Sequence, residues 1–372
     1  MRVVVAPNAF KGCLTALEAA EAIARGVTAA GGEPELVPVA DGGDGTLDVL
    51  VAGVGGSIMG VIARGPLGLP VRAHLGRLAD GSGIVEMAQA SGYALVDDAD
   101  RDALHASSYG TGELIKGALA RRPSRVLVAL GGTATVDGGM GLARALGVRF
   151  FDANDRELPD GGGALHELAR IDASRIDPRV RETPILACAD VTNPLLGPGG
   201  AALFAPQKGA TREQVSTLER GFERLAGRLS ADLGADVAGV PGAGAAGGTG
   251  AMLAALGAEL RSGSEVVLDA LGFASRIDGA DLVVTGEGRL DRQSLSGKAP
   301  IAVARACEAK LVACAAVVGE ADLPASDGGF VTVRSLVEHF GDRATAFSRA
   351  AEGLEAVSSS LLRALAGSRT RP

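Results

Sequence analysis

The sequence has 372 residues, of which 47% are hydrophobic, and it carries a formal net charge of −8 at pH 7. This length favours more than one domain, and we expect two. An acidic chain with 3% aromatic residues offers neither a basic field for a nucleic-acid backbone nor stacking surfaces for bases, so nucleic acid is excluded as a partner.

The longest uncharged stretch, residues 237–258, contains Pro241 and is rich in glycine, whereas a bilayer span is dominated by large apolar side chains. We therefore expect no membrane association. The four cysteines stand apart in apolar stretches, without a CxxC pair, and the chain opens on a strand-like run rather than a signal peptide. These features predict a reduced, cytoplasmic protein that acts on small molecules, and they leave a homo-oligomer open.

The first fifty residues predict alternating strands and helices. Residues 1–7 form a buried-strand run, and Thr15 with Glu18 is a capping box that starts a helix. A second strand over residues 36–39 ends at Asp41, and a second helix begins near Thr46. This order is typical of a parallel sheet with helical crossovers.

The pattern then changes twice along the chain. Short runs over residues 61–64, 71–75 and 84–87 predict antiparallel strands. After them we expect a helix over 111–120, strands over 125–130 and 185–189, and a long helix from Thr211. Near residue 280 the alternation of strands and helices that is typical of a parallel sheet returns. We expect strands over 281–285 and 311–318 and a helix that begins at Pro300.

We therefore predict an α/β protein of two domains. A doubly wound parallel-sheet domain, residues 1–53 plus 280–372, is split in sequence by an inserted mixed α/β domain, residues 54–279. Residues 106–136 fit either domain, because the buried strand near residue 126 suits either sheet.

Five apolar, strand-like runs each end in a loop that carries a charged side chain. Four of these loops combine glycine with an acid or a lysine, and residues 189–194 combine an acid with an amide. Glycine lets backbone N–H groups approach a ligand closely, and carboxylates bind divalent metals or accept protons. Together these loops predict a phosphate and metal site. They span residues 40–46, 130–139, 189–194, 206–210 and 284–291.

Three acids, Asp41, Asp190 and Glu287, lie one to three residues beyond predicted strand ends. In open α/β sheets ligands bind beyond the carboxyl ends of strands, although helix caps and turns also favour acids there. Only five of the 36 basic residues are lysine, and Lys11 and Lys208 precede glycines whereas Lys298 follows one. Lysine beside a flexible turn suits phosphate, and a solvated loop is the alternative for each.

One motif favours a different function. Residues 242–247 read GAGAAG and match the GxGxxG pattern of dinucleotide-binding folds, so an NAD-dependent oxidoreductase of a small hydroxy acid is the alternative. The preceding apolar run is short and meets Pro241, where that fold needs a firm strand. A non-catalytic anion-binding module is a third hypothesis, which explains the several acids poorly.

Taken in order, the motifs resemble one family. APNAFKG, PVADGGDGT, GGTATVDGG, DVTNPL, PQKGA, PGAGAAGG, TGEGRLD and GKAP, from residue 1 to about residue 318, resemble the class I glycerate kinases of bacteria. The resemblance implies a flavodoxin-like domain, a second domain likened to restriction endonucleases, and phosphorylation of D-glycerate by ATP and Mg²⁺. Asn8 and Val136 depart from the family pattern, which usually has aspartate and asparagine there.

With this resemblance the candidate residues receive roles. Asp190 is the expected base, Lys11 and Lys208 the expected catalytic cations, and Asp41, Glu287 and Asp291 the expected magnesium ligands, with Asp137 as a competing choice. Whether the 2- or the 3-hydroxyl accepts the phosphoryl group stays open. The expected substrate- and phosphate-binding residues are Arg64, Ser108, Gly131, Gly132, Thr133, Asp137, Asn193, Gln207, Gly244, Gly247, Arg289 and Lys298.

Overall fold

The computed structural model describes residues 1–369, which divide into two compact units. Unit 1 comprises residues 1–41, 48–53 and the chain from Ser264 onward, and unit 2 comprises Gly42–Leu47 and Val54–Gly263. Both units combine helices with a β-sheet, so the α/β class expected from the sequence is confirmed. None of the helices in residues 1–369 combines the length and the apolar character that a bilayer span needs.

Unit 1 contains a five-stranded sheet in the order β15-β13-β11-β1-β2, and all of its strands are parallel. Numbered by their appearance in the chain, these strands lie in the order 2-1-3-4-5, so the direction of sheet growth reverses between β1 and β11. The strands of unit 1 are β1 (Arg2–Pro7), β2 (Glu33–Leu36), β11 (Leu282–Gly286), β12 (Arg289–Leu290), β13 (Cys314–Val318), β14 (Glu320–Ala321) and β15 (Thr332–Ser335).

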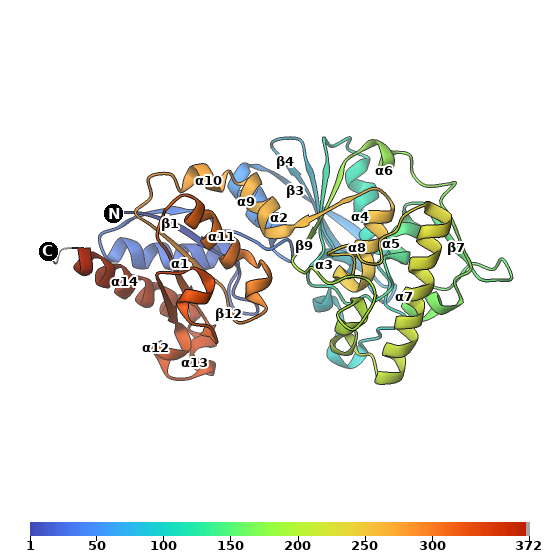
Figure 1. Ribbon diagram of the computed structural model, residues 1–372. Helices are drawn as coiled ribbons and strands as arrows, with labels where there is room; N and C mark the ends of the chain where they lie inside the picture. Colours follow the sequence, from blue (N-terminus) through green and yellow to red (C-terminus); the bar gives the residue numbers. More distant parts are fainter. Residues whose placement is uncertain (370–372) are drawn as a thin grey trace. The chain divides into compact units, whose positions relative to one another are not determined.

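The helices of unit 1 bury their apolar faces on this sheet. Ile23 of α1, Val284 of β11 and Leu354 of α14 belong to one buried core. Figure 1 shows α1 and α14 side by side, and Gly26 explains the close contact, because a Cβ there would lie 2.2 Å from the carbonyl oxygen of Glu355. The helices are α1 (Ala16–Ala29), α2 (Thr46–Val54, which crosses both units), α9 (Gly263–Ala270), α10 (Phe273–Arg276), α11 (Ala299–Ala309), α12 (Leu336–Phe340), α13 (Arg343–Ser348) and α14 (Ala350–Arg369).

The strand expected over residues 36–39 is wrong by three residues, since β2 spans Glu33–Leu36. Its sequence, EPEL, is half-exposed at the sheet edge and has no apolar alternation, so the hydrophobic pattern pointed to Val37 and Val39 instead. Both valines still donate backbone hydrogen bonds to residues of β1. The loop that leads to Asp41 therefore runs alongside β1, as the sequence suggested.

Unit 2 contains a six-stranded mixed sheet in the order β10-β9-β6-β5-β4-β3. The strands β10, β9, β6 and β5 are parallel, and β4 and β3 continue the sheet antiparallel. Because β6 lies inside this sheet, residues 106–136 belong to unit 2. Its strands are β3 (Gly56–Arg64), β4 (Pro70–Leu78), β5 (Gly83–Glu86), β6 (Val126–Ala129), β7 (Arg149–Phe151), β8 (Arg170–Asp172), β9 (Ile185–Ala189) and β10 (Glu259–Ser262).

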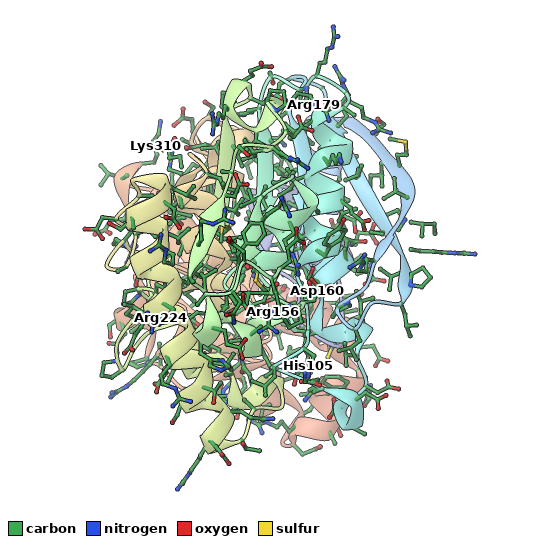
Figure 2. All side chains as sticks on the ribbon, turned by 90° about the vertical axis from the view of Figure 1, so that its right-hand side faces the viewer. His105, Arg156, Asp160, Arg179, Arg224 and Lys310 are labelled. Carbon is green, nitrogen blue, oxygen red and sulfur yellow. The ribbon has the colours of Figure 1, made fainter. Side chains whose placement is uncertain are left out.

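The longest helix of unit 2, α7, begins at the predicted capping box of Thr211 and Gln214. Leu218, Phe222 and Leu225 recur at helical spacing and are buried in the unit 2 core, and Figure 2 marks this helix with Arg224. The helices of unit 2 are α3 (Ala88–Ser91), α4 (Tyr109–Leu119), α5 (Met140–Ala145), α6 (Arg179–Glu182), α7 (Arg212–Leu233) and α8 (Ala245–Ala255).

Candidate active site

A cavity of about 300 Å³ lies in unit 1 beyond the carboxyl ends of β1 and β11, the point at which the strand order reverses. Open α/β sheets bind ligands at such a point, because two loops diverge there and leave a crevice. The loop after β1 contributes Asn8 and Lys11, and the loop after β11 contributes Glu287. Asp41, Asp291 and Lys298 complete the polar part of the wall.

Glu287 is an acid of this cavity with a raised pKa. Its side chain is 6% exposed, and Ser294 Oγ donates a hydrogen bond of 2.7 Å to its Oε1. Burial raises the pKa of Glu287 to about 7, and the negative charges of Asp41 and Asp291 add to this shift, whereas the Ser294 hydrogen bond and Lys298 oppose it. A raised pKa with two acids nearby marks a place where a bound cation stabilises the carboxylates.

The neighbouring acids are held by local bonds. Asp41 is 4% exposed and its Oδ2 accepts from Nδ2 of Asn8 at 3.4 Å, so Asn8 reaches the acid group although it carries no charge itself. Asp291 Oδ1 accepts the backbone N–H groups of Gln293 and Ser294 and fixes the turn after β12. Among residues 1–369, no three His, Cys, Asp or Glu side chains gather closely enough to hold a metal unaided.

The cations around the cavity fall into two kinds. Arg289, expected to bind the substrate carboxylate, is exposed and forms a 2.6 Å ion pair with Asp322, and Arg343 pairs with Glu320. Lys11 and Lys298 form no ion pair within 4 Å among the described side chains. The two lysines are therefore the cations that are available to an incoming anion.

In unit 2, the carboxylate of Asp137 is completely buried and accepts four hydrogen bonds. Its Oδ2 accepts from the backbone N–H and the Oγ–H of Ser108, both at 2.8 Å, and from the N–H of Gly141 at 3.1 Å. Its Oδ1 accepts from the N–H of Gly139 at 3.1 Å. Burial raises the pKa of Asp137 and these four donors lower it. Asp137 and Ser108, both expected to bind ligand, thus join two loops to each other.

Lys208 is buried beside the same loop. Its Nζ donates to Thr133 Oγ1 at 3.0 Å and to the carbonyl oxygen of Thr135 at 2.8 Å. Burial lowers the pKa of Lys208 to about 8, and the charge of Asp137 opposes that shift. The Oγ1 of Thr135 is buried without a hydrogen-bond partner in the described chain, which leaves a polar group beside Lys208 unsatisfied.

The glycines of the GAGAAG motif serve contacts between loops. A Cβ on Gly247, whose φ is +63°, would lie 2.2 Å from the carbonyl oxygen of Thr135, and a Cβ on Gly244 would lie 2.2 Å from that of Pro194. Gly244 N–H also donates to the carbonyl of Asn193. No strand of the described chain lies between β9 and this motif, so the strand–turn–helix context of a dinucleotide fingerprint is absent.

The expected base, Asp190, directly follows β9 and is half-buried. β9 pairs in parallel with β6, whose carboxyl end leads to Gly131 and Gly132, so the two loops leave neighbouring strands at the same edge of the sheet. A Cβ on Gly131 would lie 2.6 Å from Cα of Gly43, so the 42–47 loop also packs here. The structure thus gathers the glycine-rich loops of unit 2 at one sheet edge.

One expected residue, Arg64, lies apart from this group. Arg64 lines an open groove, where its Nη1 contacts Asp160 Oδ2 at 3.2 Å and its guanidinium stacks over the Tyr109 ring. Arg144 shares Asp160, which Figure 2 labels on the surface of unit 2. The Asp137–Lys208 group contributes no residue to this groove. Gln207 meets Tyr93 through its backbone carbonyl, which accepts from the phenol.

Two residues that the structure places in these groups received no role in the sequence analysis. Ser294 is buried and bonds Glu287, and the short spacing from Asp291 to Ser294, typical of an Asx turn, was the available signal. In the sequence, Thr135 was only a second hydroxyl residue of its loop. The missing hydrogen-bond partner of its Oγ1 depends on packing, which the spacing of residues along the chain does not reveal.

Comparison with known proteins identifies the family. The glycerate kinase family model matches residues 3–366, which extends the resemblance well beyond residue 318. The chain is 42% identical to glycerate kinase of Bacillus subtilis (strain 168), covering 95% of each chain. It is 45% identical to glycerate 2-kinase of Escherichia coli (strain K12), covering 82% of this chain and 81% of the relative.

A crystal structure from Salmonella typhimurium LT2, provisionally assigned as glycerate kinase 2, superposes with a TM-score of 0.85 at 39% identity. It covers 100% of both chains, so the similarity includes both units and the segment after residue 318. The expected family is confirmed by these matches. The chain belongs to the glycerate kinase family.

Proposed function

We propose that this protein transfers the γ-phosphoryl group of ATP to a hydroxyl group of D-glycerate, with Mg²⁺ as the counter-ion of the nucleotide. Family membership supports the reaction class. The observation that carries the site assignment is the unit 1 cavity, where two lysines without ion pairs lie beside a buried acid of raised pKa. Phosphoryl transfer needs positioning and charge neutralisation more than covalent chemistry, and this cavity offers both.

The acids of the cavity fit magnesium in its usual protein environment. Mg²⁺ keeps several waters and is held by one or two carboxylates together with substrate phosphates, rather than by a complete protein cage. Asp41 and Glu287 supply two carboxylates, and Asp291 adds negative charge nearby. When bound, the metal would neutralise charge on the phosphates. Lys11 and Lys298 bind the remaining phosphate charge as compact cations.

Asp190 is the proposed base. A half-buried carboxylate at the carboxyl end of β9 is placed like other ligand-facing acids in such sheets, and it accepts the proton of the attacking hydroxyl group. Lys208 holds Thr133 and Thr135 in position, and its third N–H remains for developing negative charge. The Escherichia coli relative is a 2-kinase by name, so we propose the 2-hydroxyl as the acceptor.

We further propose that unit 1 is the flavodoxin-like domain, split in sequence, and unit 2 the inserted domain likened to restriction endonucleases. The parallel strand order 2-1-3-4-5 of unit 1 supports the first assignment. The four cysteines are free in the structure, which is consistent with a reducing compartment such as the cytoplasm.

A coupled assay of ADP release with D-glycerate, MgATP and purified protein tests the activity, and ³¹P NMR of the product identifies the phosphorylated carbon. No turnover at millimolar D-glycerate would refute the kinase assignment. Asp190→Asn should lower kcat by about 10²–10⁴, the usual contribution of a general base. Asp236→Asn, on an exposed residue of the same unit, is the matched control and should keep full turnover. Near-full turnover of folded Asp190→Asn would remove Asp190 from the role of base.

A further inference from the structure

We propose that the unit 1 cavity is the nucleotide site, with the phosphates at the carboxyl ends of β1 and β11 and the adenine base against the wall built by α12, α13 and α14. D-glycerate then binds elsewhere in the protein. The identity of the nucleotide, ATP or ADP, rests on the proposed function. The inference assigns a role to residues after 318, for which the sequence analysis found no role.

The cavity has two chemically distinct ends. Its polar end carries Lys11, Lys298 and the acids described above. Its other wall is apolar and comes from the C-terminal part of the chain, namely Leu336, Val337, Ala346, Phe347 and Ala350. A nucleotide has the same two-part chemistry, with a charged phosphate chain at one end and a flat, weakly polar base at the other.

Phe347 is the informative residue of the apolar wall. It lines the cavity, yet its side chain is 57% exposed, while its neighbours Ala346 and Ala350 are each 5% exposed. A Cβ built on Gly12 would lie 3.3 Å from the Phe347 ring, so this ring also contacts the loop that follows β1. An exposed aromatic face at the mouth of a cavity is what a stacked base covers.

D-glycerate fits this cavity poorly. It consists of a carboxylate and two hydroxyl groups on three carbons, so it has no surface that would gain by contact with Phe347 or Leu336. Ligand sites of this volume usually combine a mostly apolar lining with a few oriented polar groups, and they enclose ligands larger than a three-carbon acid.

The charges favour phosphate over a carboxylate ligand. Arg289 and Arg343, the side chains that suit bidentate carboxylate binding, are already paired with Asp322 and Glu320. The available cations are lysines, and Lys298 is also the N-cap residue of α11, an 11-residue helix whose cap has no side-chain hydrogen bond. The positive end of this helix therefore begins at the cavity wall, where it adds to the lysine charge.

The test uses the full-length protein and two probes without D-glycerate, MgADP and magnesium pyrophosphate, in titration calorimetry. Phe347→Ala should raise the Kd of MgADP by about 5- to 150-fold, the usual loss of one stacked base, and leave the Kd of pyrophosphate unchanged. Lys298→Met should raise both. Leu311→Ala, which removes a 95% exposed side chain of unit 1 away from the cavity, is the control and should change neither.

Kinetics separate this inference from the proposed reaction. Phe347→Ala should raise KM for ATP and leave KM for D-glycerate unchanged. An unchanged Kd for MgADP in Phe347→Ala, or an increase in KM for D-glycerate alone, would overturn the nucleotide assignment. If the wild-type protein binds MgADP and Phe347→Ala weakens that binding, the nucleotide site stands even when no phosphoryl group reaches D-glycerate, and only the proposed acceptor fails.

Discussion

Replacing Asp137 by asparagine separates a structural role of this buried carboxylate from a chemical one. Its two oxygens accept four hydrogen bonds, three of them from backbone N–H groups, and all four donors come from the loops around Ser108 and Gly139. Four donors on one fully buried carboxylate favour a structural role for it. We therefore expect Asp137→Asn to lower stability first and activity only as a consequence.

The bonds set the size of the effect. An amide oxygen in place of Oδ2 keeps the bonds from Ser108 and Gly141, but the amide NH₂ then faces the N–H of Gly139, so one buried donor loses its acceptor. That loss costs about 1–3 kcal/mol, and the three surviving bonds become weaker because the acceptor is no longer charged. Removal of a buried charge offsets part of this cost. We expect a net loss of about 2–4 kcal/mol in the free energy of unfolding.

The assay is calorimetric unfolding at pH 7, supported by urea unfolding followed by circular dichroism. The transition of unit 2 should fall by about 4–16 °C, given about 2–4 °C per kcal/mol for a domain of this size. Asp236→Asn, an exposed acid of the same unit, should leave the midpoint in place. A normal midpoint in Asp137→Asn together with a hundredfold loss of turnover would refute the structural reading and return Asp137 to the chemistry.

Two further substitutions test the packing and the electrostatics. Glu287→Gln should raise the unfolding midpoint of metal-free protein at pH 8 by about 6–12 °C and barely at pH 4. Because the pKa of Glu287 is raised, ionisation of its carboxyl group in the folded protein costs about 3 kcal/mol of stability. This cost is absent below pH 4.5, the ordinary pKa of the group, and complete above pH 7. Equal midpoints of the wild-type and variant proteins at pH 8 would contradict this reasoning. Gly247→Ala should destabilise unit 2 by more than about 1–2 kcal/mol, because its Cβ would overlap Thr135 at positive φ. At Gly227 in α7 a new methyl group would meet no atom within 4 Å outside the adjacent backbone of its own helix. Gly227→Ala should therefore be neutral or stabilising, and equal effects of the two changes would contradict the packing argument.

Local signals in the sequence predicted the elements well. The capping boxes of Thr15 with Glu18 and Thr211 with Gln214 start α1 and α7 as expected, because each depends only on residues three apart. The loops at residues 130–139, 189–194 and 284–291 follow strands as expected, since glycine and charge cannot continue a buried strand. The strand expected before residues 206–210 is wrong, because Ala201–Phe204 form a 3₁₀ helix there. The family and its kinase activity followed from the order of those loops.

Distant partners could not be predicted. The ion pair of Arg64 with Asp160 joins residues 96 positions apart, and no pattern near Arg64 reveals it. The GAGAAG motif was ambiguous for a similar reason, because close approach to another loop and close approach to a pyrophosphate require the same absence of a side chain. The exposure of Phe347 likewise depends on how α12, α13 and α14 pack, which a short helical pattern does not determine.

The way the chain is divided between the two units has a consequence for biosynthesis. The last segment of unit 2 ends at Gly263, whereas the sheet of unit 1 joins β1 to β11 through residues 279 positions apart. Because contacts of such long sequence separation form slowly and domains fold as units during translation, unit 2 should reach its native state on the ribosome first. Until β11 has been synthesised, the edge of β1 that pairs with it has no hydrogen-bonding partner strand. The N-terminal strand is thus synthesised first, but its pairing in the sheet is completed among the last. It is therefore the segment that most needs a chaperone to protect it.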